Sequence, residues 1–534
     1  MARRLKKRLK ISGTLLAKSP IHVGGLSAMA DVDLTLAVNG TGAYYIPGTS
    51  LAGALRGWLK EESSRIDALW GYQKSSNGKD EGHASFVVVE DAPIEDATRG
   101  GAGETVVTEI RDGVGIDRFS GSAAETVKFN RAILPKGVRI PLALTLEQGG
   151  DDEAWAEARC LFADTLHALQ SGAIRLGAAK TRGLGKIELQ DLKIVEQDLS
   201  SFDGMFNTLS ADESNTIGLA ALVPEGYRWQ LPQQIEITVG WKPVGPVMVK
   251  AEAEGIAVDM LPLVSQDEGQ PCFVIPGSAV KGALRSQAER IMRTLLSQDI
   301  PQTKDPKQRF IDQLNGIPVV DQLFGQGAKQ QGALAVDDCY ATQKLAAPEW
   351  AAVETATSEQ ALQTALQAAN LSHVQQAFHV GIDRWTGGAA DSQLYSTLEL
   401  MDVNWAPICL TVDLARLQAA EKTEEEQAEK EQIEEEQTDS AQVGIALLVL
   451  LLRDLARGRI PLGYGTNRGM GAIALQSVTI QVRSLPTDLA ALENTSLFDS
   501  DMALQDSLLL QQLNQQWQAW LSKHQNQSTG RNAA

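Results

Sequence analysis

Two aspartates are the residues of this sequence best suited to metal or proton-transfer chemistry. Asp33 and Asp259 each follow the first strand-like segment of one half of the chain, in a glycine- or alanine-rich stretch typical of a loop. A loop carboxylate can hold a hydrated magnesium ion or orient a hydroxyl group for attack on a neighbouring phosphate. Because most loop aspartates are simply solvated, this assignment depends on the motifs around them.

Two glycine-rich loops could contact phosphate. The sequence reads KTRGLG at residues 180–185 and TNRGMG at residues 466–471. Backbone N–H groups beside a fixed cation suit a phosphate backbone, although the glycines could serve only a tight turn. Neither loop has the GxxxxGK[ST] pattern of a nucleotide-binding P-loop. We therefore expect contacts with a phosphate backbone, without a bound nucleotide, from Lys180, Arg182, Gly183, Gly185, Asn467, Arg468, Gly469 and Gly471.

A second pair of motifs, IPGTS at residues 46–50 and IPGSA at residues 275–279, predicts a sharp turn into a helix. The first N–H groups of a helix have no partner inside it and can bind a phosphate. The second copy has Lys281 where the first has Ala52, so the two copies need not bind equally. Arginines in these helices could add charge or form surface salt bridges. The candidates are Gly48, Thr49, Ser50, Arg56, Gly277, Ser278, Lys281 and Arg285.

A third pair reads GIDRFSG at residues 115–121 and GIDRWTG at residues 381–387. An Asp-Arg pair often serves a local turn or an ion pair, which is the simplest interpretation of both copies.

These motifs recur in the same order with insertions between them, so the chain is a tandem duplication. The first half covers about residues 1–225 and the second about residues 230–534. A length of 534 residues is likewise too great for one ordinary core and suggests two domains.

The duplication also tests rival catalytic residues. Asp33 aligns with Asp259, whereas Asp31 aligns with Ala257 and His22 with Met248. Asp31 therefore cannot serve both halves, and the mismatch at His22 disfavours histidine acid–base chemistry as a shared mechanism.

Each half predicts an α+β domain. Period-two apolar patterns open each half as a strand, and a helix of period 3.6 follows the IPG turn. A second helix, at about residues 154–171 or 443–457, ends at a glycine cap before the glycine-rich loop and a last strand. The order strand, helix, strands, helix, strand is that of a ferredoxin-like split βαβ fold.

Composition sets limits on function without excluding nucleic acid. Of the net charge of −19, the acidic stretch at residues 421–439 contributes −8 through ten acidic residues and two lysines. The remaining sequence has local basic clusters that could bind phosphate. The four cysteines are scattered without a CxxC pair, which disfavours a zinc site or a disulfide framework. No apolar run is long enough to cross a membrane, and no secretory signal is evident, so we expect a cytoplasmic protein.

Three segments fall outside the repeated motifs. Residues at about 294–372 and the acidic stretch 421–439 are expected to be insertions. Residues 500–523 predict an amphipathic helix that packs on its own domain or on a neighbouring subunit.

The combination of an IPG(S/T) turn, an IDR block and a terminal RGxG loop resembles the RAMP superfamily. Each half is similar to a backbone subunit of a type III CRISPR effector complex, and their fusion resembles subtype III-D. The resemblance implies two RRM-like (RAMP) domains with inserted hairpins and helices, a bound guide RNA, a complementary target RNA and other effector subunits as partners. It also implies cleavage of the target beside Asp33 and Asp259, with Mg²⁺ as the expected cofactor.

The resemblance places the IDR block near a hairpin that interrupts the guide–target duplex. In that position Phe119 and Trp385 could stack on bases, beside Arg118 and Arg384. Two alternatives stay open: a scaffold that binds guide RNA without cleaving, and a guide-processing endoribonuclease, a class that usually depends on histidine.

Overall fold

The computed structural model falls into two compact units, and each has its own hydrophobic core. It describes residues 5–25, 31–62, 66–76, 79–94, 108–148, 152–210, 215–251, 255–301, 303–314, 316–327, 329–418, 430–483, 492 and 497–531. Unit 1 comprises Met1–Ile110, Arg131–Lys180 and Leu184–Pro232, and unit 2 comprises Arg111–Asn130, Thr181–Gly183 and Gln233–Ala534. Two short pieces of the first half therefore belong to unit 2.

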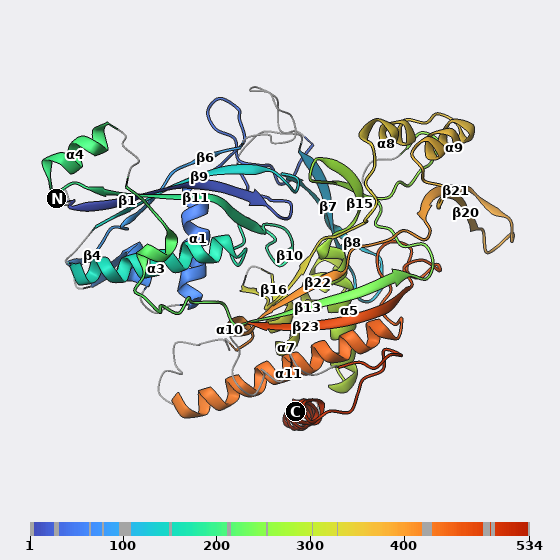
Figure 1. The fold of residues 1–534 in the computed structure, drawn as a ribbon. Coiled ribbons are helices and arrows are strands. Elements are labelled where there is room, and N and C mark those ends of the chain that lie inside the picture. The colour runs from blue at the N-terminus through green and yellow to red at the C-terminus, as the bar shows by residue number, and fades with distance from the viewer. Residues whose placement is uncertain are drawn as a thin grey trace. The chain divides into compact units, whose positions relative to one another are not determined.

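Unit 1 is built on a five-stranded sheet in the order β12-β11-β1-β9-β5. Apolar side chains alternate along β9, where Ile140, Leu142, Leu144 and Leu146 are buried, as expected for a strand with one covered face. Two helices, α1 and α3, lie against one another and cover that face (Figure 1). The main elements are β1 (Lys7–Ala17), α1 (Gly48–Glu62), β5 (Val87–Val89), β9 (Arg139–Glu147), α3 (Asp152–Gln170), β11 (Ile187–Asp198) and β12 (Thr216–Ile217).

Shorter elements complete the first half of the chain. They are β2 (Tyr45–Ile46), α2 (Ile66–Trp70), β3 (Tyr72–Ser76), β4 (Lys79–His83), β6 (Ala92–Pro93), β7 (Glu109–Ile116), β8 (Ala123–Ile133), β10 (Arg182–Gly183), α4 (Phe202–Leu209) and η1 (Leu219–Leu222).

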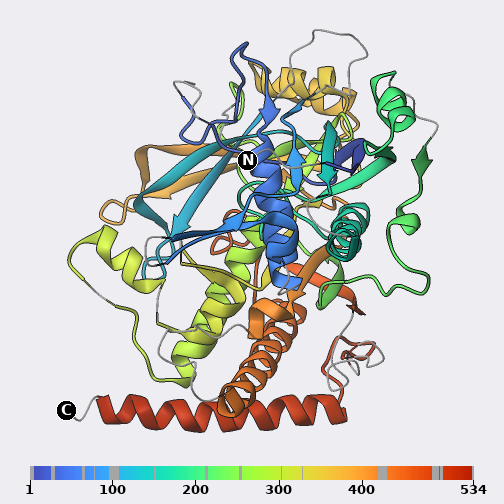
Figure 2. The same ribbon diagram turned by 90° about the vertical axis from the view of Figure 1, so that its left-hand side faces the viewer.

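Unit 2 has a sheet of the same design, in the order β10-β18-β22-β13-β23. The long helix α11 packs against β23, α5 and α7, and α12 runs across α11 (Figure 2). The main elements are β13 (Gln234–Pro243), α5 (Gly277–Leu295), α6 (Pro306–Gln313), α7 (Pro318–Phe324), β18 (Leu334–Asp337), β20 (Val374–Ile382), β21 (Ala389–Leu400), β22 (Ile408–Asp413), α11 (Lys430–Ala456), β23 (Ile473–Arg483) and α12 (Leu508–Arg531).

Smaller elements connect them. They are β14 (Val264–Asp267), β15 (Gln270–Ile275), β16 (Gly325–Gln326), β17 (Gln330–Gln331), β19 (Cys339–Tyr340), α8 (Ala347–Glu354), α9 (Glu359–Ala368) and α10 (Leu414–Gln418).

The two sheets confirm the predicted α+β, ferredoxin-like fold. In each half the first strand lies between the last and the third, and the second strand pairs with the third. The four strands are antiparallel to their neighbours, in the orders β11-β1-β9-β5 and β23-β13-β22-β18. A helix follows the first strand and another follows the third, as the split βαβ pattern requires.

The segment expected as one insertion at residues 294–372 is more complex. Its strand β18 is a core strand equivalent to β5, and its helix α7 occupies the position of α2 in the first half. Among the described residues, α6, α8 and α9 are the helices of this segment without a counterpart in the first half.

Two further expectations change in detail. The predicted helix at 443–457 begins at Lys430, so part of the acidic stretch belongs to α11, while residues 419–429 lie outside the described residues. The C-terminal helix begins at Leu508 rather than residue 500. Its residues Leu509, Leu513, Trp517 and Leu521 are buried in the core of unit 2, which agrees with packing on its own domain.

Candidate nucleic-acid interface

The two glycine-rich loops have the same backbone hydrogen bonds. In the first, the N–H of Leu176 donates to the carbonyl of Gly185 at 2.7 Å, and the N–H of Gly185 donates to the carbonyl of Pro20 at 2.8 Å. In the second, Leu462 donates to Gly471 at 2.9 Å, and Gly471 donates to Pro246 at 2.8 Å. The alignment of the two halves therefore holds at the level of individual hydrogen bonds.

The glycines of these loops are needed for the backbone path. Gly185 and Gly471 have φ values of +87° and +85°, a region that favours glycine. A Cβ on Gly185 would lie 2.2 Å from the carbonyl oxygen of Leu176. Because the N–H groups of Gly185 and Gly471 donate to the carbonyls of Pro20 and Pro246, these two amides are not available to phosphate, and side chains become the main candidates for phosphate contact.

Arg468 is the best-placed of these side chains in the second loop. It is exposed, and its guanidinium lies over the ring of Tyr464 at 5.1 Å and also contacts the hydroxyl of Tyr395. The ring of Tyr395 stacks on His379 at 5.2 Å. This aromatic support was not predicted, because Tyr395 and His379 lie on the β20–β21 hairpin, far from the loop in sequence. Arg182, its equivalent in the first half, is exposed in β10.

The remaining loop candidates differ in exposure. Asn467 and Gly469 are exposed, Lys180 is half-buried, and Gly183 is buried.

The first N–H of each predicted phosphate-binding helix is bound by a carboxylate of the protein itself. Gly48 donates to Asp91 at 2.7 Å and Gly277 donates to Asp338 at 2.8 Å. Sequence reasoning missed these two aspartates, although they occupy equivalent positions shortly after the aligned strands β5 and β18. At least one amide of each helix is thus unavailable to RNA, while the side chains of Thr49 and Ser278 remain exposed and that of Ser50 is half-buried.

Lys281 has a structural position. It is 5% exposed, and its ammonium group donates to the carbonyl of Leu334 at 2.7 Å. We therefore remove Lys281 from the RNA-binding candidates.

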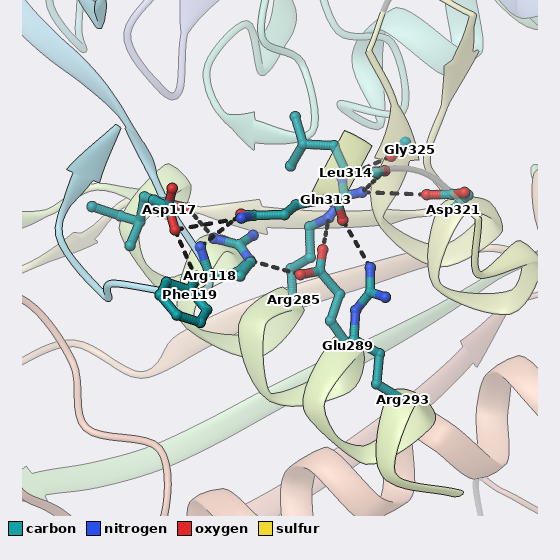
Figure 3. A network of polar contacts seen from close by, with 11 residues as sticks. Asp117, Arg118, Phe119, Arg285, Glu289, Arg293, Gln313, Leu314, Asp321 and Gly325 are labelled. Carbon is teal, nitrogen blue, oxygen red and sulfur yellow. Dashed lines mark hydrogen bonds and ion pairs between the residues drawn. The ribbon is translucent and has the colours of Figure 1, made fainter. Parts of the chain in front are cut away.

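Arg285 is also committed to contacts inside unit 2 (Figure 3). Its guanidinium pairs with Glu289 at 2.7 Å and Asp321 at 3.3 Å, and it donates to the carbonyl of Gly325 at 2.8 Å. Burial raises the pKa of Asp321 to about 6, although the nearby Arg285 acts in the opposite direction. These contacts agree with the ion-pair alternative for Arg285.

Arg56 repeats this arrangement in unit 1. It donates to the carbonyl of Gly71 at 3.3 Å and lies 3.7 Å from the carboxylate of Asp67. With 49% of its side chain exposed, Arg56 can still contact an external phosphate.

The first IDR block, residues 115–121, lies at the tip of the β7–β8 hairpin and is called the first IDR tip; the second IDR tip is residues 381–387 of the β20–β21 hairpin. The first IDR tip belongs to unit 2 and is held by α5 and α6 (Figure 3). Arg118 pairs with Glu289 at 2.6 Å, and Asp117 pairs with Arg309 at 2.9 Å. The backbone N–H of Arg118 donates to the side chain of Gln313 at 2.8 Å. Although burial opposes ionisation, hydrogen bonds from backbone N–H groups, Arg309 and Gln313 lower the pKa of Asp117 to about 2. Arg118 is therefore structural.

The aromatic residues of both IDR tips are exposed. Phe119 is 58% exposed and lies under the guanidinium of Arg309, with 5.9 Å between that group and the ring centroid. Trp385 is 95% exposed, and Arg384 beside it is also exposed.

Asp33 and Asp259 occupy equivalent backbone positions. The residue after each forms a parallel bridge to the hairpin of its own half, Leu34 to Arg131 and Met260 to Thr397. The carbonyl of Leu34 accepts from Ala132 at 3.0 Å, and that of Met260 accepts from Leu398 at 2.9 Å. Both aspartates are exposed.

The described residues form no preassembled metal site around Asp33 or Asp259. Among the described residues, no three His, Cys, Asp or Glu side chains gather in a group that could hold a metal. Mg²⁺ is usually bound through one or two carboxylates together with water and substrate phosphates. An exposed aspartate carboxylate fits that pattern when RNA supplies the phosphate ligands.

His22 is unsuited to acid–base chemistry. Its ring is 4% exposed, and Nδ1 lies 2.7 Å from the carbonyl of Ala132. Burial lowers the pKa of His22, with the Ala132 carbonyl acting in the opposite direction.

A comparison with known protein families identifies the family of this chain. The model of the RAMP superfamily matches residues 14–188 and 262–474, one region in each half. A search of curated proteins found no match. Within the described ranges, no helix is long and apolar enough to cross a membrane. The chain therefore belongs to the RAMP superfamily, which makes it an RNA-binding, CRISPR-associated protein.

Proposed function

We propose that the chain is a tandem backbone subunit of a type III CRISPR ribonucleoprotein, in an arrangement resembling subtype III-D. It binds guide RNA through both halves and cleaves the complementary target RNA once per half. Family membership and the presence of two complete domains in one chain support this function.

The observation that carries the cleavage proposal is the equivalent placement of Asp33 and Asp259. Both are exposed and directly precede the residue that bridges to the base of a hairpin. A catalytic group used in two halves must occur in both, and Asp31 fails this test because its equivalent is Ala257. Each carboxylate would orient a ribose 2′-hydroxyl of the target toward the adjacent phosphate. Bound Mg²⁺ would stabilise the negative charge that develops there.

Guide RNA would lie along exposed basic residues of the two halves. Arg468 and Arg182 are the main candidates of the glycine-rich loops, with Arg56 in the first helix of unit 1. Phosphate contacts of this kind position a strand without reading its sequence.

A scaffold without cleavage is the second candidate, supported by the environment of Asp259. Its Oδ2 accepts two hydrogen bonds from Ser396, as a purely structural aspartate would.

Cleavage of labelled complementary RNA by the purified complex, with and without Mg²⁺, separates the two functions. Asp33→Ala should remove one product boundary and Asp259→Ala the other, while the double variant still binds target. Asp31→Ala is the matched control and should leave both cuts. If the double variant makes both cuts, the aspartate mechanism is wrong.

A further inference from the structure

The second IDR tip repeats the turn of the first without the contacts that hold the first. In both tips the aspartate carboxylate accepts the N–H of the aromatic residue two positions later, at 2.8 Å for Asp117 and at 2.8 Å for Asp383. In the first tip the next residue, Arg118, binds Glu289. Among the described residues, Arg384 makes no hydrogen bond or ion pair. Two tips of the same shape thus differ in whether their charges are paired.

The side chains that pack on the glycine of each hairpin strand also differ between the two hairpins. A Cβ on Gly115 would lie 2.5 Å from the ring of Phe310 on α6 and 2.6 Å from Val127 of the same hairpin. Glycine at this position therefore lets an aromatic ring pack directly on the strand. The equivalent Gly381 has Gln393 of its own hairpin nearby. Among the described residues, no aromatic ring packs on Gly381 as Phe310 packs on Gly115.

The second hairpin also exposes more apolar surface than the first. Phe378, Val380, Ile382 and Leu394 are 60%, 46%, 58% and 66% exposed. In the first hairpin, the positions of Phe378 and Leu394 are taken by Asp112 and Lys128, which form an ion pair at 3.0 Å. Contiguous exposed apolar side chains of this kind mark protein interfaces.

We propose that the second hairpin, residues 374–400, docks onto a different protein subunit that presents the same chemistry as α5 and α6. That subunit supplies a carboxylate for Arg384, a guanidinium for Asp383 and an aromatic ring that packs on Gly381. The contacts of Asp117, Arg118 and Gly115 define this chemistry (Figure 3).

Another copy of this chain does not fit as the partner. In the described part of the chain, the acceptor on α5 and α6 is filled by the first hairpin of the same chain. In the first half, the helix at the position of α5 is α1. The sequence between α1 and α2 is too short to contain an α6.

The inference goes beyond the proposed function but rests on the chain acting in a multi-subunit complex. The test uses the complex purified through a tag on this chain, with a benzophenone amino acid in place of Trp385. Because Phe119 lies against Arg309 of its acceptor, the equivalent position should reach the partner. The expected product is a cross-link to a different protein subunit. With the benzophenone in place of Phe119, the matched control, the cross-link should form within the chain, to α6.

Charge reversal provides the second arm. Arg384→Glu should remove the cross-linked subunit from the complex without changing thermal unfolding of the isolated chain. Arg118→Glu should lower the thermal unfolding temperature of the isolated chain and leave that subunit in the complex, because its partner Glu289 is in the same chain. The inference is overturned if position 385 cross-links to RNA or to another copy of this chain, or if Arg384→Glu leaves composition and cross-linking unchanged. Cleavage is not the readout, so failure of the aspartate mechanism would not affect this result.

Discussion

Ser396 donates both its backbone N–H and its hydroxyl to Oδ2 of Asp259, at 2.7 and 3.0 Å. Ser396 is buried on β21, so it fixes an exposed loop carboxylate to the rigid base of the hairpin. The second oxygen, Oδ1, accepts no hydrogen bond from the described residues and is available to a hydroxyl group or a hydrated ion.

Ser396→Ala should therefore slow the cut assigned to Asp259 and leave the cut assigned to Asp33 unchanged. Removing one hydrogen bond to a charged group corresponds to about 1.5–3 kcal/mol when it is fully felt, so we expect at least a tenfold lower rate. Single-turnover rates for the two product boundaries measure this effect, and Ser396→Thr should restore much of it. Equal slowing of both cuts would show that Ser396 acts on folding of the chain instead.

Sequence patterns predicted the features that depend on neighbouring residues. Alternation predicted the strands, and the glycine after α3, Gly172, has a φ of +70° and ends the helix as expected. The internal alignment also placed Asp33 on Asp259, because the same local motifs surround both residues.

The partners of buried polar groups were not predictable in the same way. Asp338 lies 61 residues from Gly277, and Glu289 lies 171 residues from Arg118. Such contacts depend on how distant segments pack. A lysine or arginine in a repeated motif therefore looks the same in sequence whether it faces solvent or, like Lys281, a buried carbonyl.

Two glycines of α5 should respond oppositely to alanine. A Cβ on Gly277 would lie 2.2 Å from the carbonyl oxygen of Val336, whereas a Cβ on Gly282 meets nothing within 4 Å. We expect Gly277→Ala to destabilise unit 2 by about 1–3 kcal/mol through overpacking. Gly282→Ala should stabilise it by about 0.5–1 kcal/mol, because alanine loses less entropy in a helix. Denaturant unfolding of the full chain measures both, and equal effects would contradict the close approach at Gly277.

Asp117→Asn should change how stability depends on acid pH. The pKa of Asp117 is about 2 in the folded chain and near 3.8 ordinarily. Its ionised form therefore contributes stability above about pH 4, and this contribution disappears as the pH falls toward 2. The depressed pKa corresponds to about 2 kcal/mol.

Denaturant unfolding from pH 7 to pH 2 tests this expectation. The wild type should be more stable than Asp117→Asn at neutral pH, and the two should converge in acid. Asp383→Asn is the matched control, because among the described residues its carboxylate makes contacts only within its own exposed turn, where the backbone N–H of Trp385 also lowers the pKa of Asp383. A pH-independent difference for Asp117→Asn would assign the effect to altered packing rather than to the missing charge.

Arg468→Ala combined with Arg182→Ala should weaken RNA binding to unrelated sequences about equally. Arg468 is exposed and held by two tyrosine rings, an arrangement that presents a cation to a passing strand. Removing each arginine–phosphate ion pair should reduce the slope of log affinity against log salt by about 1, so the double variant should reduce it by about 2. The control for each single substitution is Arg457→Ala, which removes one positive charge from an exposed position at the end of α11. Fluorescence anisotropy across a salt series measures the slope. An unchanged slope would rule out phosphate binding by these arginines. A loss of affinity for some RNA sequences only would indicate base recognition.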